Sequence, residues 1–146
     1  MILLLQRVRR AGVEVSGAVV GEIGAGLLVF VCAEPPDDES TVSRAVDKVL
    51  KLRIFSDERG RMNRSVQDTA GGLLVVSQFT LGADTAGGNR PSFSAVAPPE
   101  QGRALYETFL RLAAQRHPVV QAGVFGAEMQ VALVNDGPVT IPMRIR

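Results

Sequence analysis

The central stretch of the chain reads Leu73-Leu74-Val75-Val76-Ser77-Gln78-Phe79-Thr80-Leu81, with no charged residue in it. An apolar, uncharged run of this length is typical of a strand buried on both faces. Its polar end is unusual, because a buried hydroxyl or amide that lacks a hydrogen-bond partner costs roughly 1–3 kcal/mol. Two explanations are open: Ser77 and Thr80 bond to neighbouring backbone, or a ligand supplies the missing partners.

Further strands are expected on both sides of this stretch. Apolar and polar residues alternate over residues 2–15, and glycines then separate two short apolar runs near 18–23 and 27–33. This spacing predicts an antiparallel meander. Near the C-terminus residues 129–134 alternate again, and residues 139–141 follow a turn.

Two segments with helical spacing lie between the strands. An acidic segment with two prolines, residues 35–39, opens the first helix, and Pro98-Pro99 opens the second. Residues 56–72 are polar and are expected to be loosely ordered around a turn. The sequence therefore predicts an α+β fold in a single domain, 1–146, in which a β-rich sheet or partly closed barrel is covered by two helices.

Charge and composition exclude several classes of partner. The chain has 146 residues and a formal net charge of +1, so no overall electrostatic field attracts nucleic acid. Contact with RNA would have to come from a local patch, and no DNA partner is expected. No stretch approaches the roughly 18 consecutive apolar residues that cross a membrane. We expect a cytoplasmic protein with no membrane partner.

The inventory of reactive side chains is small. The single histidine, His117, is expected as a cation at the end of the second helix, and the single cysteine, Cys32, lies in an apolar strand. These two cannot form a Ser-His-Asp or Cys-His arrangement, and no metal-ligand spacing is present, so neither a metal nor a cofactor is expected. Ser77, Gln78 and Thr80 remain, together with backbone groups. Thr80 as a nucleophile would lack a general base.

Four further segments match one family pattern in order with residues 77–81. They are Gln6-Arg7-Val8, Arg53-Ile54-Phe55-Ser56-Asp57, Arg90-Pro91-Ser92-Phe93 and Asn135-x-Gly137-Pro138-x-Thr140. Taken together, these segments resemble the D-aminoacyl-tRNA deacylases, and the resemblance covers nearly the whole chain. It departs from the family in the tail, residues 141–146, where Pro142 predicts an edge strand.

The resemblance implies a fold, an assembly and a reaction. The fold would be the dedicated deacylase fold, in a homodimer with its active sites at the subunit interface. The reaction would be hydrolysis of the ester that joins a D-amino acid, or glycine, to the 3′ adenosine of tRNA, assisted by the ribose 2′-OH. The catalytic segment would be Ser77, Gln78, Phe79 and Thr80.

The resemblance also implies how handedness is tested. Gly137-Pro138 would be a cis peptide that enters the partner's pocket, captures the α-amino group of a D-residue and clashes with an L-residue. By base rate the bond would be trans, since only about 5–6% of X–Pro bonds are cis. The residues assigned to substrate binding and chiral selection are Gly137, Pro138, Arg7, Gln6, Asn135 and Thr140.

Two alternatives of other kinds stay open at this point. One is a non-catalytic module on the same fold that binds tRNA or protein. The other is a Thr-dependent esterase that acts on a different acyl substrate.

Overall fold

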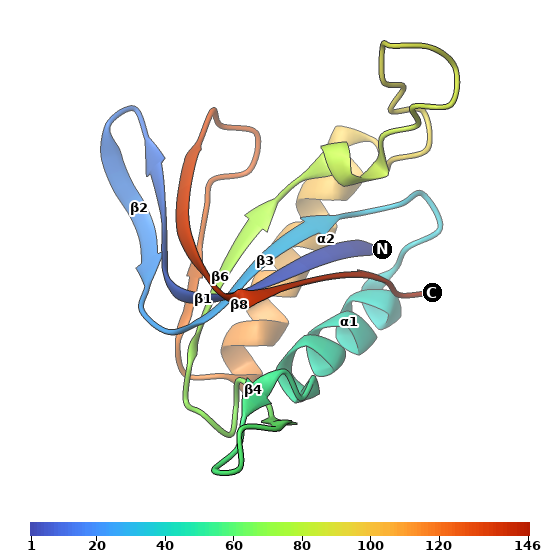
Figure 1. The fold of residues 1–146 in the computed structure, drawn as a ribbon. Helices are drawn as coiled ribbons and strands as arrows, with labels where there is room; N and C mark the ends of the chain where they lie inside the picture. The colour runs from blue at the N-terminus through green and yellow to red at the C-terminus, as the bar shows by residue number, and fades with distance from the viewer.

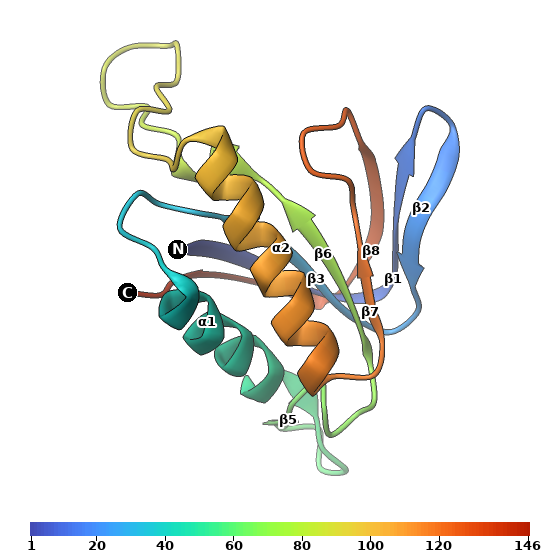
Figure 2. The same cartoon turned by 180° about the vertical axis from the view of Figure 1, so that it is seen from behind.

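The computed structural model describes residues 1–146 and has two layers, a curved sheet and two helices on one of its faces (Figures 1 and 2). The helices are α1 (Glu39–Lys51) and α2 (Pro99–Arg116). The six strands of the large sheet are β1 (Ile2–Val15), β2 (Ala18–Ile23), β3 (Gly26–Cys32), β6 (Gly72–Ser77), β7 (Val120–Ala122) and β8 (Gln130–Arg144). A separate small sheet pairs β4 (Phe55–Ser56) with β5 (Met62–Arg64). The predicted α+β class is confirmed.

The long strand β1 organises one half of the sheet. Its first half pairs antiparallel with β3 and its second half with β2, so both strands lie along the same edge of β1. The predicted meander is therefore wrong in its order: β3 does not pair with β2 but continues along β1 beyond it. Strand β8 pairs with β1 on the opposite edge and has no strand beyond it. Pro142, which cannot donate a backbone hydrogen bond, thus lies on an edge strand as expected.

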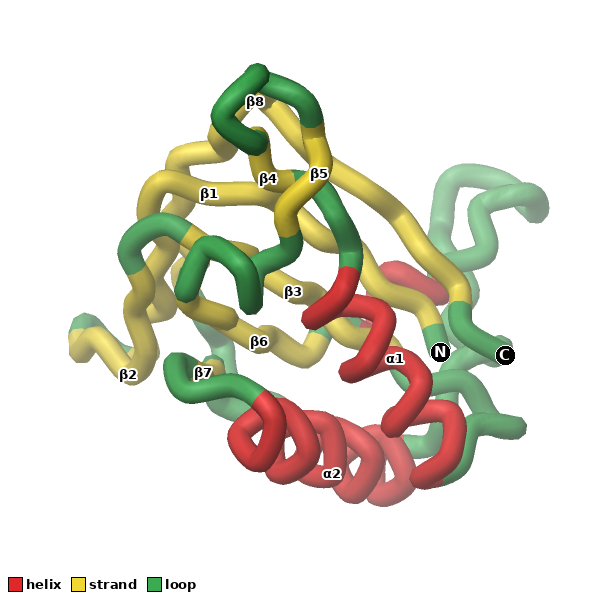
Figure 3. Tube along the Cα trace, turned by 90° about the horizontal axis from the view of Figure 1, so that it is seen from below, coloured by secondary structure: helices red, strands yellow, loops and turns green.

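The other half of the sheet is parallel. Strand β6 pairs parallel with β3, and β7 pairs parallel with β6. The helix α1 lies in the connection from β3 to β6, and α2 lies in the connection from β6 to β7. The sheet curls until β2 approaches β6 and β7, which gives a nearly closed barrel (Figure 3). The short strand β7 was not predicted from the sequence.

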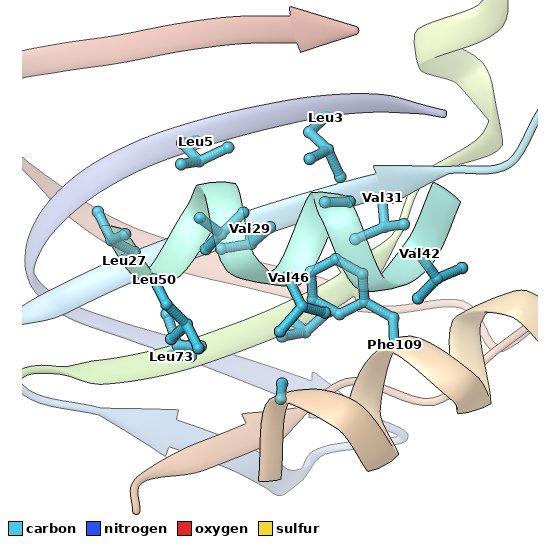
Figure 4. Packing of buried hydrophobic residues seen from close by; sticks show 14 of the residues in the cluster. Leu3, Leu5, Leu27, Val29, Val31, Val42, Val46, Leu50, Leu73 and Phe109 are labelled. Atoms are coloured by element: carbon cyan, nitrogen blue, oxygen red, sulfur yellow. The ribbon is translucent and has the colours of Figure 1, made fainter. Parts of the chain in front are cut away.

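Two apolar clusters explain why the central strands are hydrophobic on both faces. Leu73 and Val75 point to the larger cluster, beneath the helices, where Phe109 of α2 packs (Figure 4). Leu74 and Val76 point to a second cluster inside the curl of the sheet. All four side chains are at most 1% exposed. The predicted strand buried on both faces is confirmed, but it ends at Ser77.

Each helix has an identifiable start and end. The Asp38 carboxylate caps α1 by accepting the Thr41 N–H at 2.8 Å, and this bond lowers the pKa of Asp38. Helix α2 starts with Pro99 at its first position. His117 follows its last turn, but its side chain is buried rather than in contact with solvent. Its Nε2 lies 2.6 Å from the Gly71 carbonyl oxygen and therefore donates to it.

Residues 56–72 are more ordered than predicted. Strands β4 and β5 form a hairpin whose tip turns at Gly60, where φ is +74°. The Asp57 carboxylate accepts the backbone N–H groups of Arg59 and Arg61, each at 2.9 Å, and so fixes the tip. No helix of the structure has the length and apolar character needed to span a membrane.

Candidate active site

The polar end of the central stretch lies where β6 stops. The Gln78 N–H still donates to the Val31 carbonyl of β3 at 2.8 Å, and a single 3-10 turn, η1 (Phe79–Gly82), follows. The expected strand continuation through Leu81 is therefore wrong. This turn leaves the backbone N–H groups of Phe79 and Thr80 without an acceptor, because the first donors of a helical turn have none behind them.

The hydroxyl groups of the stretch do not bond to neighbouring backbone. The Gln78 side-chain amide donates to Thr80 Oγ1, so the Thr80 hydroxyl hydrogen is directed elsewhere. The Ser77 hydroxyl has no intramolecular hydrogen bond. No histidine, lysine or carboxylate bonds to Thr80, so no general base is in place to activate it as a nucleophile.

An apolar cavity of about 370 Å³ lies beside this turn. Ser77 and Phe79 form part of its wall, and α2 contributes Gly102 and Tyr106. Phe79 is 57% exposed and packs edge-to-face on Phe93, with ring centroids 5.0 Å apart. The cavity therefore joins the predicted segment to the loop that holds the matched residue Phe93, and to a helix that the sequence did not connect with it.

Two titratable groups in the wall keep their protons. Burial raises the pKa of Tyr106 to about 12, and its hydroxyl donates to the Val75 carbonyl at 2.8 Å. Burial also raises the pKa of the Cys32 thiol, whose sulfur lies 3.4 Å from the Phe79 carbonyl oxygen. A thiol held protonated in this way is a poor nucleophile.

The second motif lies on the edge strand β8. The Gly137–Pro138 peptide bond is cis, as the resemblance implied, and Gly137 has a φ of +126°. Arg7 of β1 donates from Nε to the Asp136 carbonyl at 3.1 Å and from Nη1 to the Ile54 carbonyl at 2.7 Å. A Cβ on Gly137 would lie 2.9 Å from Arg7 Nη2, so a side chain there would displace this arginine, and the positive φ also favours glycine.

The other predicted selection residues support the same turn. Thr140 Oγ1 accepts the Gln6 side-chain amide at 3.3 Å and the Asn135 amide at 2.9 Å. The Asn135 Oδ1 atom is buried and has no partner within the chain. Gln6, Arg7, Asn135, Gly137, Pro138 and Thr140 therefore form one connected group.

The two groups do not meet within one chain. Strand register places Ser77 level with Val31 and Leu3, whereas Gly137 lies at the level of Arg7 and Leu73. Four residues along the strands and three strand spacings across the sheet separate them, on the order of 20 Å. One chain thus presents the predicted catalytic segment and the predicted selection turn at two separate places.

Comparison with known proteins identifies the family. The model of the family described as D-Tyr-tRNA(Tyr) deacylase matches residues 4–144. The chain belongs to this deacylase family. It is therefore an enzyme of the hydrolase class, and the resemblance found in the five sequence segments is confirmed.

Individual relatives agree with this assignment. Proteins named D-aminoacyl-tRNA deacylase from Paracidovorax citrulli and Methylibium petroleiphilum are 65% and 64% identical, covering 99% and 98% of this chain and 94% of each relative. A solved structure titled c-Myc DNA Unwinding Element Binding Protein is 38% identical with a TM-score of 0.95, covering 100% of this chain and 99% of that one. A second, titled as a probable eukaryotic D-amino acid tRNA deacylase, is 19% identical, covers 97% of both chains and supports the fold with a TM-score of 0.85.

Several residues of the cavity were missed by sequence reasoning. Gly102, Tyr106 and Phe125 lie far from residues 77–80 in the chain and carry no local motif. The one available signal was Gly102, a glycine inside a helical pattern, where a small residue indicates close packing or open space. Among His, Cys, Asp and Glu side chains, no three lie close enough together to hold a metal ion.

Proposed function

We propose that the chain hydrolyses the ester bond of D-aminoacyl-tRNA, and of tRNA mischarged with glycine, and that it rejects L-aminoacyl-tRNA. The observation that carries this proposal is the pair of unbonded backbone N–H groups at Phe79 and Thr80, beside an apolar cavity and without any nucleophile–base pair. Such a site suits a substrate that is already reactive and that brings its own hydroxyl. Because aminoacyl-tRNA is used in the cytoplasm, we place the enzyme there.

The proposed reaction uses water as the nucleophile and the ribose 2′-OH as an aid. Water adds to the ester carbonyl, and the N–H groups of Phe79 and Thr80 stabilise the oxyanion, each worth roughly 10²–10³ in rate. The 2′-OH orients the water and relays a proton to the leaving 3′ oxygen. The carbonyl–oxygen bond then breaks, giving a free amino acid and a tRNA with a 3′-OH. The Thr80 hydroxyl donates a hydrogen bond to the substrate, keeps its proton and forms no covalent bond.

The cavity is the proposed place for the terminal adenosine. Its volume of about 370 Å³ lies in the range of pockets that enclose small ligands, and its wall is mostly apolar. The exposed ring of Phe79 stands at its rim, where it can stack on a base or ribose. The ester would then lie over the backbone of residues 79–80.

We propose that chirality is tested by the Gly137–Pro138 turn of a second subunit. Because this turn and the catalytic segment are separated within a chain, a two-fold dimer would bring them together twice. A backbone unit held against Cα tests handedness alone, since every L-residue places its Cβ where the peptide stands. Glycine has no Cβ and would pass. Arg7 keeps the turn in place through the Asp136 carbonyl.

Two rival functions are less well supported. A Thr-dependent esterase would need a base at Thr80, where the observed partner is the Gln78 amide, a proton donor. A non-catalytic binding module has no need for unbonded N–H groups beside the pocket.

The test is release of the amino acid from tRNA charged with D-tyrosine, L-tyrosine or glycine. The D-tyrosyl and glycyl esters should be hydrolysed and the L-tyrosyl ester should survive. A D-tyrosyl ester on tRNA ending in 2′-deoxyadenosine should be nearly inert. Equal release of D- and L-tyrosine would contradict the chiral function, and normal cleavage of the deoxy substrate or a trapped acyl-Thr80 would contradict the mechanism.

A further inference from the structure

Positive charge is concentrated in the β4–β5 hairpin and its entry. Residues 53–64 contain four arginines, one aspartate and one glutamate, whereas the whole chain has a net charge of only +1. The remainder of the chain is therefore slightly negative. A local basic arm on an otherwise near-neutral protein requires a local explanation.

The acidic groups of the hairpin are already occupied. Asp57 Oδ1 accepts the backbone N–H groups of Arg59 and Arg61, and hydrogen bonds from the backbone hold the pKa of Asp57 below its usual value. Glu58 forms an ion pair with Arg64. The guanidinium groups of Arg59 and Arg61 have no ion-pair or hydrogen-bond partner, and both residues are exposed.

The hairpin is joined to the selection turn by one side chain. Arg7 donates to the Ile54 carbonyl at the base of the hairpin and to the Asp136 carbonyl beside Gly137. The hairpin consequently lies at the end of the sheet away from η1 and beside β1 and β8 (Figures 1 and 3). Because Arg7 links them, the hairpin and the selection turn lie close together in any assembly of the chain.

We propose that the β4–β5 hairpin binds the phosphate backbone of tRNA, and that it does so for the substrate whose 3′ end occupies the partner subunit's cavity. The inference rests on the proposed function, because the selection turn faces the partner's cavity only in that dimer. Guanidinium groups suit this ligand, since their planar donors bind phosphate oxygens in pairs. A phosphate contact by Arg59 and Arg61 adds affinity without sequence preference.

The first test removes the two free charges with Arg59→Gln and Arg61→Gln together. KM for D-tyrosyl-tRNA should rise roughly tenfold at moderate salt, and the slope of log KM against log salt should fall by roughly 0.7–0.9 for each lost phosphate contact. D-tyrosyl-adenosine, which has no phosphate, should be hydrolysed as by the native enzyme. The matched control is Arg44→Gln with Arg111→Gln, which removes the same charge from the helices.

Three outcomes overturn the proposal. They are an unchanged KM and salt slope in the hairpin variant, an equal rise in KM in the control, and a rise for D-tyrosyl-adenosine as well. If the native enzyme releases no D-tyrosine from tRNA at all, the proposed function itself fails, which is a separate result.

The second test asks which subunit's hairpin is used. In a mixed dimer, one subunit would carry Gly102→Leu, which fills its cavity, and would keep a native hairpin. The other subunit would keep a native cavity and carry the hairpin changes Arg59→Gln and Arg61→Gln. The KM of this dimer should equal the native value, because the one open cavity faces the native hairpin. Placing both changes in one subunit beside a native partner should raise KM. The reverse pair of results overturns the assignment to the partner.

Discussion

The predicted catalytic segment, residues 77–80, and the predicted selection turn, residues 135–140, differ in how the chain holds them. Residues 77–80 follow a strand buried on both faces, and the cavity beside them is walled by a helix of the same chain. Residues 135–140 lie on an edge strand with no strand beyond it, supported chiefly by Arg7 and Gln6 from β1. A single chain therefore encloses the cavity beside residues 77–80 but leaves Gly137 and Pro138 exposed on an edge strand.

The largest effect should come from filling the cavity. A Cβ on Gly102 would meet the Phe125 ring at 3.7 Å, an ordinary contact, so a longer side chain would extend into the space. Gly102→Leu should reduce D-tyrosyl-tRNA hydrolysis to the spontaneous rate while the folded protein remains at least as stable, since leucine favours helix by about 1 kcal/mol over glycine. Gly102→Ala is the control and should stay active. An active leucine variant would mean that the substrate binds elsewhere.

A smaller but still large effect is expected at the selection turn. At Gly137, where φ is +126°, any side chain is strained and would push against Arg7. Gly137→Ala should lower kcat/KM for D-tyrosyl-tRNA by roughly 10²-fold, because a displaced positioning group costs about that much.

Gly17→Ala is the matched control for this strain. It also has positive φ, but nothing lies within 4 Å of the added methyl group. It should lose stability without losing activity. Equal activity of both variants would show that the turn plays no part in the reaction.

Thr80 tests whether the catalytic segment works through its backbone or its side chain. Thr80→Ala removes one hydroxyl donor and leaves both N–H groups in place, so kcat should fall only about tenfold, the value of one hydrogen bond. Thr80→Ser keeps the hydroxyl and should restore the rate. Complete loss of activity in the alanine variant would favour a nucleophilic threonine.

The smallest effect concerns the cavity wall at high pH. Burial raises the pKa of Tyr106 to about 12, against about 10 in an unfolded chain, so only the unfolded state loses this proton in between. The resulting stability is complete below about pH 10 and is lost as pH rises towards 12. Tyr106 is the only tyrosine and there is no tryptophan, so tyrosinate absorbance reports it directly.

Tyr106→Phe removes this proton and the bond to the Val75 carbonyl. The variant should lose about 1 kcal/mol near neutrality and show a flatter loss of stability at alkaline pH. A native titration midpoint near 10 would contradict the burial of this hydroxyl.

Local patterns predicted the parts of the fold that depend on neighbours in the chain. Leu73–Val76 indicated a doubly buried strand, and Asp38 marked the start of α1. The order of strands was not predictable in this way. Gly26 lies opposite Gly72, and a Cβ on it would overlap the Gly72 backbone, but a glycine in a sequence does not name the strand it will approach.

In the candidate site, too, the local features were predictable and the long-range contacts were not. Motif residues such as Gln78 and Gly137 were recognisable because their spacing is local. The rest of the cavity wall was not, because Gly102, Tyr106 and Phe125 reach residues 77–80 only through the crossover of α2. Strand β7 has three residues, too few for a period to be seen.

Complementation between subunits tests the central claim most directly. Mixed dimers would be isolated with two affinity tags, one subunit carrying Gly102→Leu and the other Gly137→Ala. If cavity and turn act across the interface, this dimer has one complete site and should recover about half of the native activity per dimer. A dimer carrying both changes in one subunit beside a native partner should be inactive. Activity in that second dimer, with none in the first, would contradict the account, because it would mean that each chain builds its site alone.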